Sequence, residues 1–155
     1  MKKIPLTQNQ FALVDNEDFE RINSVKWYAA RMRNGFYAMR SRPKTGDRLM
    51  HREILKCPKG MVVDHINHNT LDNRKKNLRI CTPQNNQHHQ NVGKANRSGY
   101  KGVYLHSRGT RYVAQIKLNR KMLYLGTFDT AIEGARAYNT AAKLHHKQFA
   151  VLNKI

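Results

Sequence analysis

The chain has 155 residues, which is room for one mid-sized domain or two small ones. It carries 29 Lys and Arg against 10 Asp and Glu, and the resulting formal charge of +19 argues against an enzyme of small neutral substrates and favours a polyanionic partner. No apolar run approaches the roughly 20 residues that cross a bilayer, and no apolar stretch follows the basic start. We therefore expect an intracellular protein, neither secreted nor membrane-bound, that acts on nucleic acid and has no small-molecule substrate.

Residues 1–50 carry short apolar runs separated by turn signals. Phe11–Val14 and Phe36–Met39 are two such runs, and Asn34-Gly35 before the second is typical of a β-hairpin turn. Four arginines lie in the same region: Arg31, Arg33, Arg40 and Arg42. Two interpretations stay open for them, a hairpin that grips the DNA backbone or the solvated rim of a small core.

Residues 62–86 hold the densest group of polar side chains. Val62-Val63 is β-prone and runs into Asp64-His65, a polar loop follows, and Leu78–Cys81 indicates a return strand. Thr82-Pro83 is typical of a helix start, with Thr as N-cap and Pro at the first helical position. This segment therefore predicts strand, loop, strand and helix, with Asn86 in the first helical turn.

Four of these side chains suit the hydrolysis of a phosphodiester bond. That chemistry needs a base to deprotonate water and a metal to stabilise developing charge. The imidazole of His65 can be neutral near pH 7, and the oxygen of Asn77 can accept its Nδ1–H and hold its tautomer. Asp64 and Asn86 offer the oxygen ligands that Mg²⁺ or Mn²⁺ prefers. Taken singly, each has an ordinary alternative, because Asp-His pairs are usually surface groups and loop asparagines usually form turns.

The second half of the chain begins with a polar stretch, Gln87–Ser98, which reads as a basic linker. Three strand-like runs follow at Gly102–Leu105, Arg111–Leu118 and Met122–Leu125. A helix is then predicted from Thr130, because Glu133 three residues later completes a capping box. Residues 93–155 hold 12 basic and 2 acidic residues, so this half is strongly positive by itself.

The order Asp64-His65, Asn77-Leu78-Arg79 and Asn86 resembles the HNH (His-Me finger) nucleases, and is closest to the phage homing-endonuclease branch whose last motif position is Asn. The resemblance implies that His65 is the general base, that Asn77 orients it, and that Asp64 and Asn86 hold one divalent metal. It also implies a lead-in strand at Met50–Leu55 and products with 5′-phosphate and 3′-hydroxyl ends. His88 and His89 stand just beyond Asn86 and are alternative metal ligands. The two cysteines, Cys57 and Cys81, cannot supply the Cys₄ zinc site that braces many relatives, and we expect both to be small buried residues.

A second resemblance covers Ser98–Asn153. The segments Ser98–Tyr104, Tyr112–Lys117, Tyr124–Thr130 and Gly134–Ala142 resemble, in order, the plant ethylene-response-factor (APETALA/ERF) DNA-binding domain. That resemblance implies a three-stranded sheet that enters the major groove. It places these residues against DNA: Lys101, Tyr104, His106, Gln115, Lys117 and Tyr124. The plant domains carry Arg or Trp at several of these positions, so the docking mode is carried over and the recognised bases are not.

The sequence thus predicts an α+β protein. A β-rich lead-in and a ββα-metal nuclease module occupy residues 1–86, a linker 87–98, and a three-stranded antiparallel sheet backed by one helix 99–155. The predicted function is a metal-dependent endonuclease of double-stranded DNA, of homing type and monomeric or homodimeric. Its one active site per chain would nick one strand, and a double-strand break would require a dimer or two successive events. Arg52, Arg79 and Arg111 join the residues expected to contact DNA. Two alternatives stay open: a catalytically inert DNA-binding regulator, and an RNA-binding protein that stacks bases on its tyrosine-rich sheet.

Overall fold

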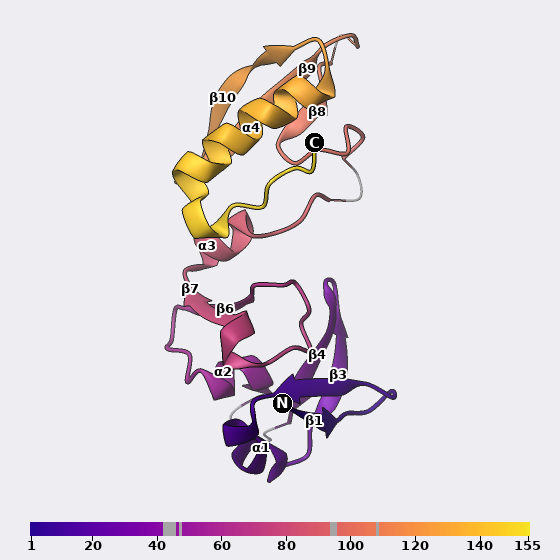
Figure 1. Ribbon diagram of the computed structural model, residues 1–155, viewed down its shortest axis with the longest axis vertical. Helices are drawn as coiled ribbons and strands as arrows, with labels where there is room; N and C mark the ends of the chain where they lie inside the picture. Colours follow the sequence, from indigo (N-terminus) through magenta and orange to yellow (C-terminus); the bar gives the residue numbers. More distant parts are fainter. Residues whose placement is uncertain (42–45, 47, 94–95, 108) are drawn as a thin grey trace. The chain divides into compact units, whose positions relative to one another are not determined.

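The computed structural model describes residues 1–41, 46, 48–93, 96–107 and 109–155. The chain forms two compact units, Met1–Pro83 and Gln84–Ile155 (Figure 1). Both are built from small antiparallel sheets and short helices, so the predicted α+β class is confirmed. Within the described residues, no helix combines the length and the apolar character needed to cross a membrane.

In its described residues, the first unit contains three small sheets and two helices. A hairpin of β1 and β2 precedes α1, a three-stranded sheet has the order β3-β4-β5, and a two-stranded ribbon pairs β6 with β7 after α2. The expected hairpin at Asn34-Gly35 is confirmed, since β3 and β4 flank it. The bounds are β1 Lys2–Pro5, β2 Phe11–Val14, α1 Asn16–Asn23, β3 Tyr28–Met32, β4 Gly35–Arg40, β5 Arg48–Leu49, α2 Met50–Ile54, β6 Val62–His65, the 3-10 turn Lys75–Asn77 and β7 Leu78–Cys81.

One hydrophobic core holds these pieces together, because none of the small sheets can bury its apolar face alone. The core contains Ile4, Val14, Ile22, Trp27 and Met50, together with Val63 and Leu78 from the β6–β7 ribbon. The indole Nε1 of Trp27 donates to the carbonyl of Ile22 at 2.7 Å, which satisfies its one donor in the interior. The ribbon that carries Asp64 and His65 is thereby packed against the whole unit.

The strand expected at Met50–Leu55 is wrong, because this segment forms the helix α2. Met50, His51 and Ile54 are all buried, and positions 50 and 54 lie one above the other on one helical face. A helix buries both side chains on one face, and this burial in the core favours the helix over a strand. The helix brings His51 to the interior.

The part of the second unit that the structure describes contains one sheet, two helices and a short 3-10 turn. Strands β8, β9 and β10 form an antiparallel sheet of order β10-β9-β8, and α4 packs against it. The bounds are α3 Pro83–His88, β8 Val103–Leu105, β9 Tyr112–Leu118, β10 Lys121–Phe128, α4 Ala131–His146 and the 3-10 turn Lys147–Phe149. The capping box at Thr130 and Glu133 is confirmed, with both reciprocal hydrogen bonds present.

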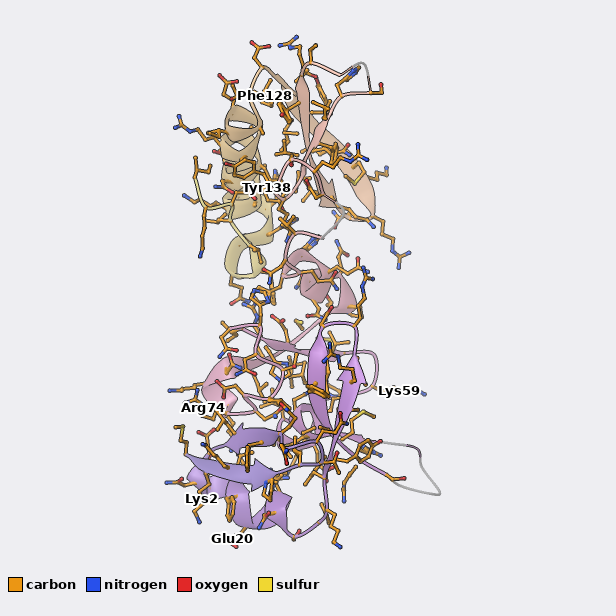
Figure 2. All side chains as sticks on the ribbon, turned by 90° about the vertical axis from the view of Figure 1, so that its right-hand side faces the viewer. Lys2, Glu20, Lys59, Arg74, Phe128 and Tyr138 are labelled. Carbon is orange, nitrogen blue, oxygen red and sulfur yellow. The ribbon has the colours of Figure 1, made fainter. Side chains whose placement is uncertain are left out.

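Small residues let α4 lie close to the sheet. Ala135, Tyr138 (labelled in Figure 2) and Ala142 are buried on the helix, and Ala114 and Ile116 of β9 are buried on the facing side of the sheet. The inner face of the sheet is therefore used for the core, and its outer face, on the other side of the strands, is not covered by α4.

Gly102 lies at the tightest approach in this unit, and its replacement by Ala is expected to destabilise the fold. Its φ is +75°, and a Cβ there would lie 2.1 Å from the Tyr138 Cδ2 atom and 2.7 Å from the carbonyl oxygen of Gln115. We expect Gly102→Ala to lower the free energy of unfolding by about 2 to 3 kcal/mol, measured by chemical denaturation.

Gly99→Ala is the matched control. Gly99 has a φ of +74°, but the space that an added Cβ would enter is open, with nothing within 4 Å. We expect this substitution to cost about 1 kcal/mol, which is the strain of positive φ alone. Equal losses in the two variants would show that the approach to Tyr138 is not tight.

Candidate active site and nucleic-acid interface

The β6–β7 ribbon carries the polar pair Asp64-His65 at the end of its first strand. Asp64 lies opposite Arg79 and His65 opposite Leu78 in the antiparallel register. Only 6% of Asp64 and 5% of His65 is exposed, although adjacent strand residues point to opposite faces. Both faces of the ribbon are therefore covered at this end, and neither residue is the surface group that such a pair usually is.

The loop between the two strands is held by a polar network. The side-chain oxygen of Asn77 accepts from the backbone N–H of Asn67 at 2.9 Å, and its Nδ2 donates to the carbonyl of Asp72 at 2.8 Å. The carboxylate of Asp72 accepts from Nε of Arg74 at 2.7 Å and from Nη2 at 2.6 Å. These hydrogen bonds from Arg74 hold the pKa of Asp72 below its usual range. Asn77 thus closes the neck of the loop.

The side chain next to His65 is Asn73, and not the Asn77 expected from the sequence. The Oδ1 atom of Asn73 lies 3.4 Å from Nε2 of His65. The loop network brings Asn73 inward, and only 1% of this residue is exposed. An amide oxygen can only accept, so this contact assigns the proton to Nε2 and leaves the lone pair on Nδ1.

Two further rings surround His65, and sequence reasoning missed both. The rings of His51 and His65 meet edge to face with centroids 4.9 Å apart, and Tyr37 lies 5.9 Å from the first and 6.1 Å from the second. Burial lowers the pKa of His51 to about 3, helped by the nearby His65. Burial also lowers the pKa of His65, against the opposing effects of Asn73 and Asp64. Both imidazoles are neutral at pH 7.

Asp64 forms an ion pair with Arg79, its cross-strand neighbour. Nε of Arg79 donates to Oδ2 of Asp64 at 2.8 Å, and Nη2 lies 2.7 Å from the same oxygen. Arg79 was expected to contact DNA, and the structure instead directs its guanidinium to the carboxylate. An ion at Asp64 would share the carboxylate with this guanidinium.

Asn86 lies on α3, in the second unit, whereas Asp64 and His65 belong to the first. The C-terminal end of α3 is bound by residues of its own unit. The Nζ atom of Lys101 donates to the carbonyls of His88 at 2.6 Å and Gln90 at 2.5 Å, and the ring of His88 stacks on His146 with centroids 3.8 Å apart. Burial and the neighbouring His146 lower the pKa of His88 to about 4.

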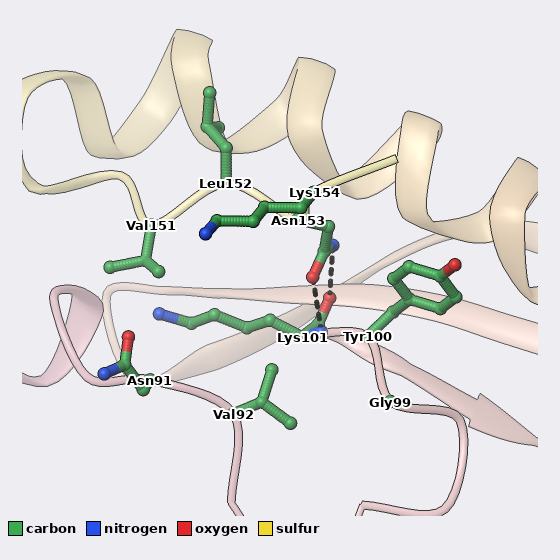
Figure 3. Close-up of a pocket in the computed structure, with 9 residues that line it drawn as sticks. All are labelled: Asn91, Val92, Gly99, Tyr100, Lys101, Val151, Leu152, Asn153 and Lys154. Carbon is green, nitrogen blue, oxygen red and sulfur yellow. Dashed lines mark hydrogen bonds between the residues drawn. The ribbon is translucent and has the colours of Figure 1, made fainter.

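Lys101, which was expected to contact DNA, thus directs its ammonium group to main-chain carbonyls of its own unit. It lines a pocket of about 330 Å³ with Tyr100, Asn91 and the C-terminal segment (Figure 3). Its backbone N–H and carbonyl are held by the side chain of Asn153, at 2.7 and 3.1 Å. Burial lowers the pKa of Lys101 to about 8. Within the polar stretch 87–98, the structure describes all but residues 94 and 95, and His88 and Gln90 are fastened by this one ammonium group.

The outer face of the β8–β10 sheet gathers several of the expected DNA contacts. Directly opposed residues share a face, and the register pairs Tyr104 with Val113, Gln115 with Tyr124, and Lys117 with Met122. The outer face, on the side away from α4, consists of Tyr104, Val113, Gln115, Lys117, Met122, Tyr124 and Thr127. Strand alternation would have found Val113 from Gln115 and Met122 from Tyr124, which sequence reasoning missed, whereas Thr127 joins this face only through the register shift between Tyr124 and Gly126. His106 follows β8 and is exposed.

Three further arginines also make contacts inside the protein. Arg111 donates to Asp129 at 2.8 Å, although both side chains are exposed. Arg52 donates to the carbonyls of Met61 at 2.8 Å and Pro58 at 3.3 Å and so holds the turn before β6. Arg40, from the N-terminal basic run, pairs with Glu53.

The other members of that run differ from Arg40. The guanidinium of Arg31 lies 5.1 Å from the ring centroid of Phe36, and Arg33 is exposed. Arg42 lies outside the described residues. Arg40 therefore fits the interpretation as part of the rim of a small core. For Arg31 and Arg33, both this interpretation and a contact with the DNA backbone remain open.

Comparison with known proteins decides the family. Residues 56–88, which span the β6–β7 ribbon and α3, match the family model for HNH endonuclease. An HNH endonuclease of Acanthamoeba polyphaga mimivirus is 31% identical over 151 residues, which is 94% of this chain and 75% of that protein. This chain belongs to the HNH endonuclease family. These enzymes are phosphodiester hydrolases.

Two further relatives match parts of the HNH endonuclease chain. Protein 3.8 of Escherichia phage T7 is 31% identical over 93 residues, 60% of this chain and 76% of that protein. The APETALA2-like protein 2 of Oryza sativa is 45% identical over 58 residues, 36% of this chain but only 13% of the rice protein. Both expected resemblances, to HNH nucleases and in part to the plant domain, are confirmed.

The donor atoms of the HNH endonuclease suit a hard divalent cation. Within the described residues, no three His, Cys, Asp or Glu side chains converge on one point. The carboxylate of Asp64 is an oxygen donor of the kind that Mg²⁺ or Mn²⁺ prefers, with water and phosphate as further ligands, and the role expected for Asn86 stays a prediction. Among the described residues neither cysteine forms a disulfide; Cys81 is buried as expected, whereas Cys57 is only half-buried.

Proposed function

We propose that this HNH endonuclease hydrolyses phosphodiester bonds of double-stranded DNA with His65 as general base. The observation that carries the proposal is the environment of His65: a buried, neutral imidazole beside Asp64, with Asn73 against its Nε2 atom. A base that is already neutral at pH 7 can accept a proton without first losing one.

The chain's own residues supply most of the reaction. His65 accepts a proton on Nδ1 from water, the oxygen of that water bonds to phosphorus, the bond from phosphorus to the 3′ oxygen breaks, and the leaving 3′ oxygen takes up a proton from solvent. The products carry 5′-phosphate and 3′-hydroxyl ends. Asn73 holds the ring orientation throughout.

Asp64 is the residue of the first unit that would hold one Mg²⁺ or Mn²⁺, and the expectation that Asn86 is a second ligand stays a prediction. When bound, such an ion stabilises the negative charge that develops on the phosphate oxygens. Arg79 donates to the carboxylate of Asp64. If a metal ion took over this carboxylate, the guanidinium could instead donate to a phosphate oxygen of the DNA.

We further propose that the two halves divide the work, as residues 1–86 for cleavage, 87–98 for connection and 99–155 for targeting. The excess of 12 basic over 2 acidic residues in 93–155 supports a polyanionic target for the C-terminal half. The identity to the rice APETALA2-like protein supports a sheet-type reader. One active site per chain would nick one strand, and a homodimer would be needed to cut both at once, in line with a homing-type role.

The proposed function is tested with supercoiled plasmid and purified protein in Mg²⁺ or Mn²⁺, with EDTA as control. The expected product is open-circle DNA that forms only with metal. Linear DNA as the first product would show that both strands are cut together, which would indicate a homodimer and not a nicking monomer. Tight duplex binding without cleavage of any DNA offered, including DNA from the source of the chain, would favour the inert regulator.

The two lysines expected to contact DNA are predicted to behave differently. Lys117 is exposed on the outer face, whereas Lys101 is fastened to backbone carbonyls. Each lost phosphate contact lowers the slope of log K against log salt by about 0.9. We expect Lys117→Ala to flatten the slope by about that amount in a fluorescence-anisotropy titration, and Lys101→Ala to leave it unchanged.

Lys101→Ala should instead lower the melting temperature of the protein, because the carbonyls of His88 and Gln90 lose their shared donor. A flattened salt slope for Lys101→Ala without loss of thermal stability would return Lys101 to the DNA interface.

A further inference from the structure

The centre of the outer face of the β8–β10 sheet is uncharged. Across the three strands, Tyr104, Val113 and Thr127 form one row and Gln115 and Tyr124 the next. Lys117 is the one cation among the seven outer-face residues, and it pairs with Met122 toward the turn between β9 and β10. Exposed basic residues Arg120 and Lys121 lie at this turn.

This composition suits one kind of base pair. Guanine is read in the major groove chiefly by Arg or Lys, whose donors match its O6 and N7 acceptors. Lys117 lies at one end of the face, and two other basic residues expected to contact DNA are bound within the protein: Arg111 to Asp129 and Lys101 to main-chain carbonyls. The middle rows therefore offer no guanidinium fork for guanine.

Gln115 is the polar side chain at the centre of the face. It lies on the middle strand, directly across from Tyr124, and a hydrogen bond with Tyr104 on its other side orients its amide. A primary amide offers one donor and one acceptor, which is the pair that adenine N7 and N6 require.

The neighbouring side chains supply apolar contacts. Met122 is 53% exposed and Tyr124 is 60% exposed, and Val113 and Thr127 add methyl groups in the adjoining row. The C5-methyl of thymine is the apolar group that the major groove presents to such side chains. The hydroxyl of Tyr124 is held by Thr127 at 2.6 Å, so the ring is fixed in place.

We propose that this face reads A·T base pairs in the major groove, with Gln115 bound to adenine and Met122 and Val113 against thymine methyl groups. The proposal rests on the duplex-DNA role proposed above and makes it specific. A protein partner would also fit an apolar face, but the basic β9–β10 turn and the charge of this half favour DNA.

The first experiment selects binding sites for the full-length protein from a random duplex library, in EDTA to prevent cleavage. We expect consecutive A·T pairs at the core of the selected sites. Gln115→Ala should lose the preference at one adenine, by roughly tenfold or more. Arg136→Gln, a change on exposed α4, is the control that should alter nothing in the selected core.

The second experiment replaces thymine by uracil in the selected site, which removes the C5-methyl group and nothing else. Binding weakened several-fold in the wild type, and less in Met122→Ala, is the expected result. Selected cores of G·C pairs, or equal binding of the thymine and uracil duplexes, would overturn the A·T readout while leaving the duplex-DNA role intact. Absence of any duplex binding would instead overturn the proposed function on which the readout depends.

Discussion

His65→Ala is expected to lower the rate of DNA cleavage by about two to four orders of magnitude, the usual contribution of a positioned general base. His65 is buried and its pKa is lowered, so it carries no charge at pH 7 and makes no ion pair with phosphate in the bound complex. Removing it should therefore leave DNA affinity nearly unchanged. Single-turnover cleavage of supercoiled plasmid gives the rate, and anisotropy in EDTA gives the affinity.

His145→Ala is a suitable control, because His145 is an exposed histidine on α4 in the second unit. It should cleave at the wild-type rate. A melting curve for His65→Ala separates loss of chemistry from loss of fold. A folded His65→Ala protein that cuts as fast as the wild type would end the assignment of His65 as the base.

Alanine substitutions of two asparagines in the loop between β6 and β7 are expected to have different effects on cleavage and stability. Asn73→Ala removes the oxygen that faces Nε2 of His65, so the ring loses its orientation and we expect a 10- to 100-fold lower cleavage rate with wild-type DNA affinity. Asn77→Ala removes the two hydrogen bonds that close the neck of the loop. It should first lower thermal stability, by about 1 to 3 kcal/mol.

Asn73→Asp offers a sharper comparison, since a carboxylate still accepts from Nε2 and would restore much of the rate. Cleavage by Asn77→Ala that is weaker than by Asn73→Ala, at unchanged melting temperature, would reinstate Asn77 as the orienting residue. Equal and modest losses in both variants would remove any special role for Asn73.

Local patterns predicted the elements of this protein well. The capping box at Thr130, the hairpin at Asn34-Gly35 and the strand–loop–strand–helix order of residues 62–88 all depend on neighbours within a few positions. The helix at Met50–Ile54 was missed because five residues are too few for a period to be recognised, and its form is decided by burial in a core assembled from distant strands.

The contacts of single side chains were harder to predict, because they depend on how the loop between β6 and β7 folds. Asn73 and Asn77 are chemically identical, and only the network around Asp72 decides which one meets His65. The same holds for the basic residues. A count of arginines cannot show that Arg79 donates to the carboxylate of Asp64 or that Arg52 donates to a main-chain carbonyl of the turn before β6. His51 came to the site through the unexpected helix, so no motif pointed to it.

The attachment of α3 has a consequence for how such proteins are assembled in evolution. The family match runs to residue 88, yet the end of α3 is bound by Lys101 and His146, which lie beyond that match. The end of the family match therefore does not coincide with the end of the set of residues that hold α3 in place. A recombination event at the polar stretch after His89 would transfer a nuclease whose last helix had lost its neighbours. A new C-terminal half would have to supply its own hydrogen-bond donor, in place of Lys101, and its own stacking ring, in place of His146. This requirement limits which DNA-binding domains can replace the present one without further mutations.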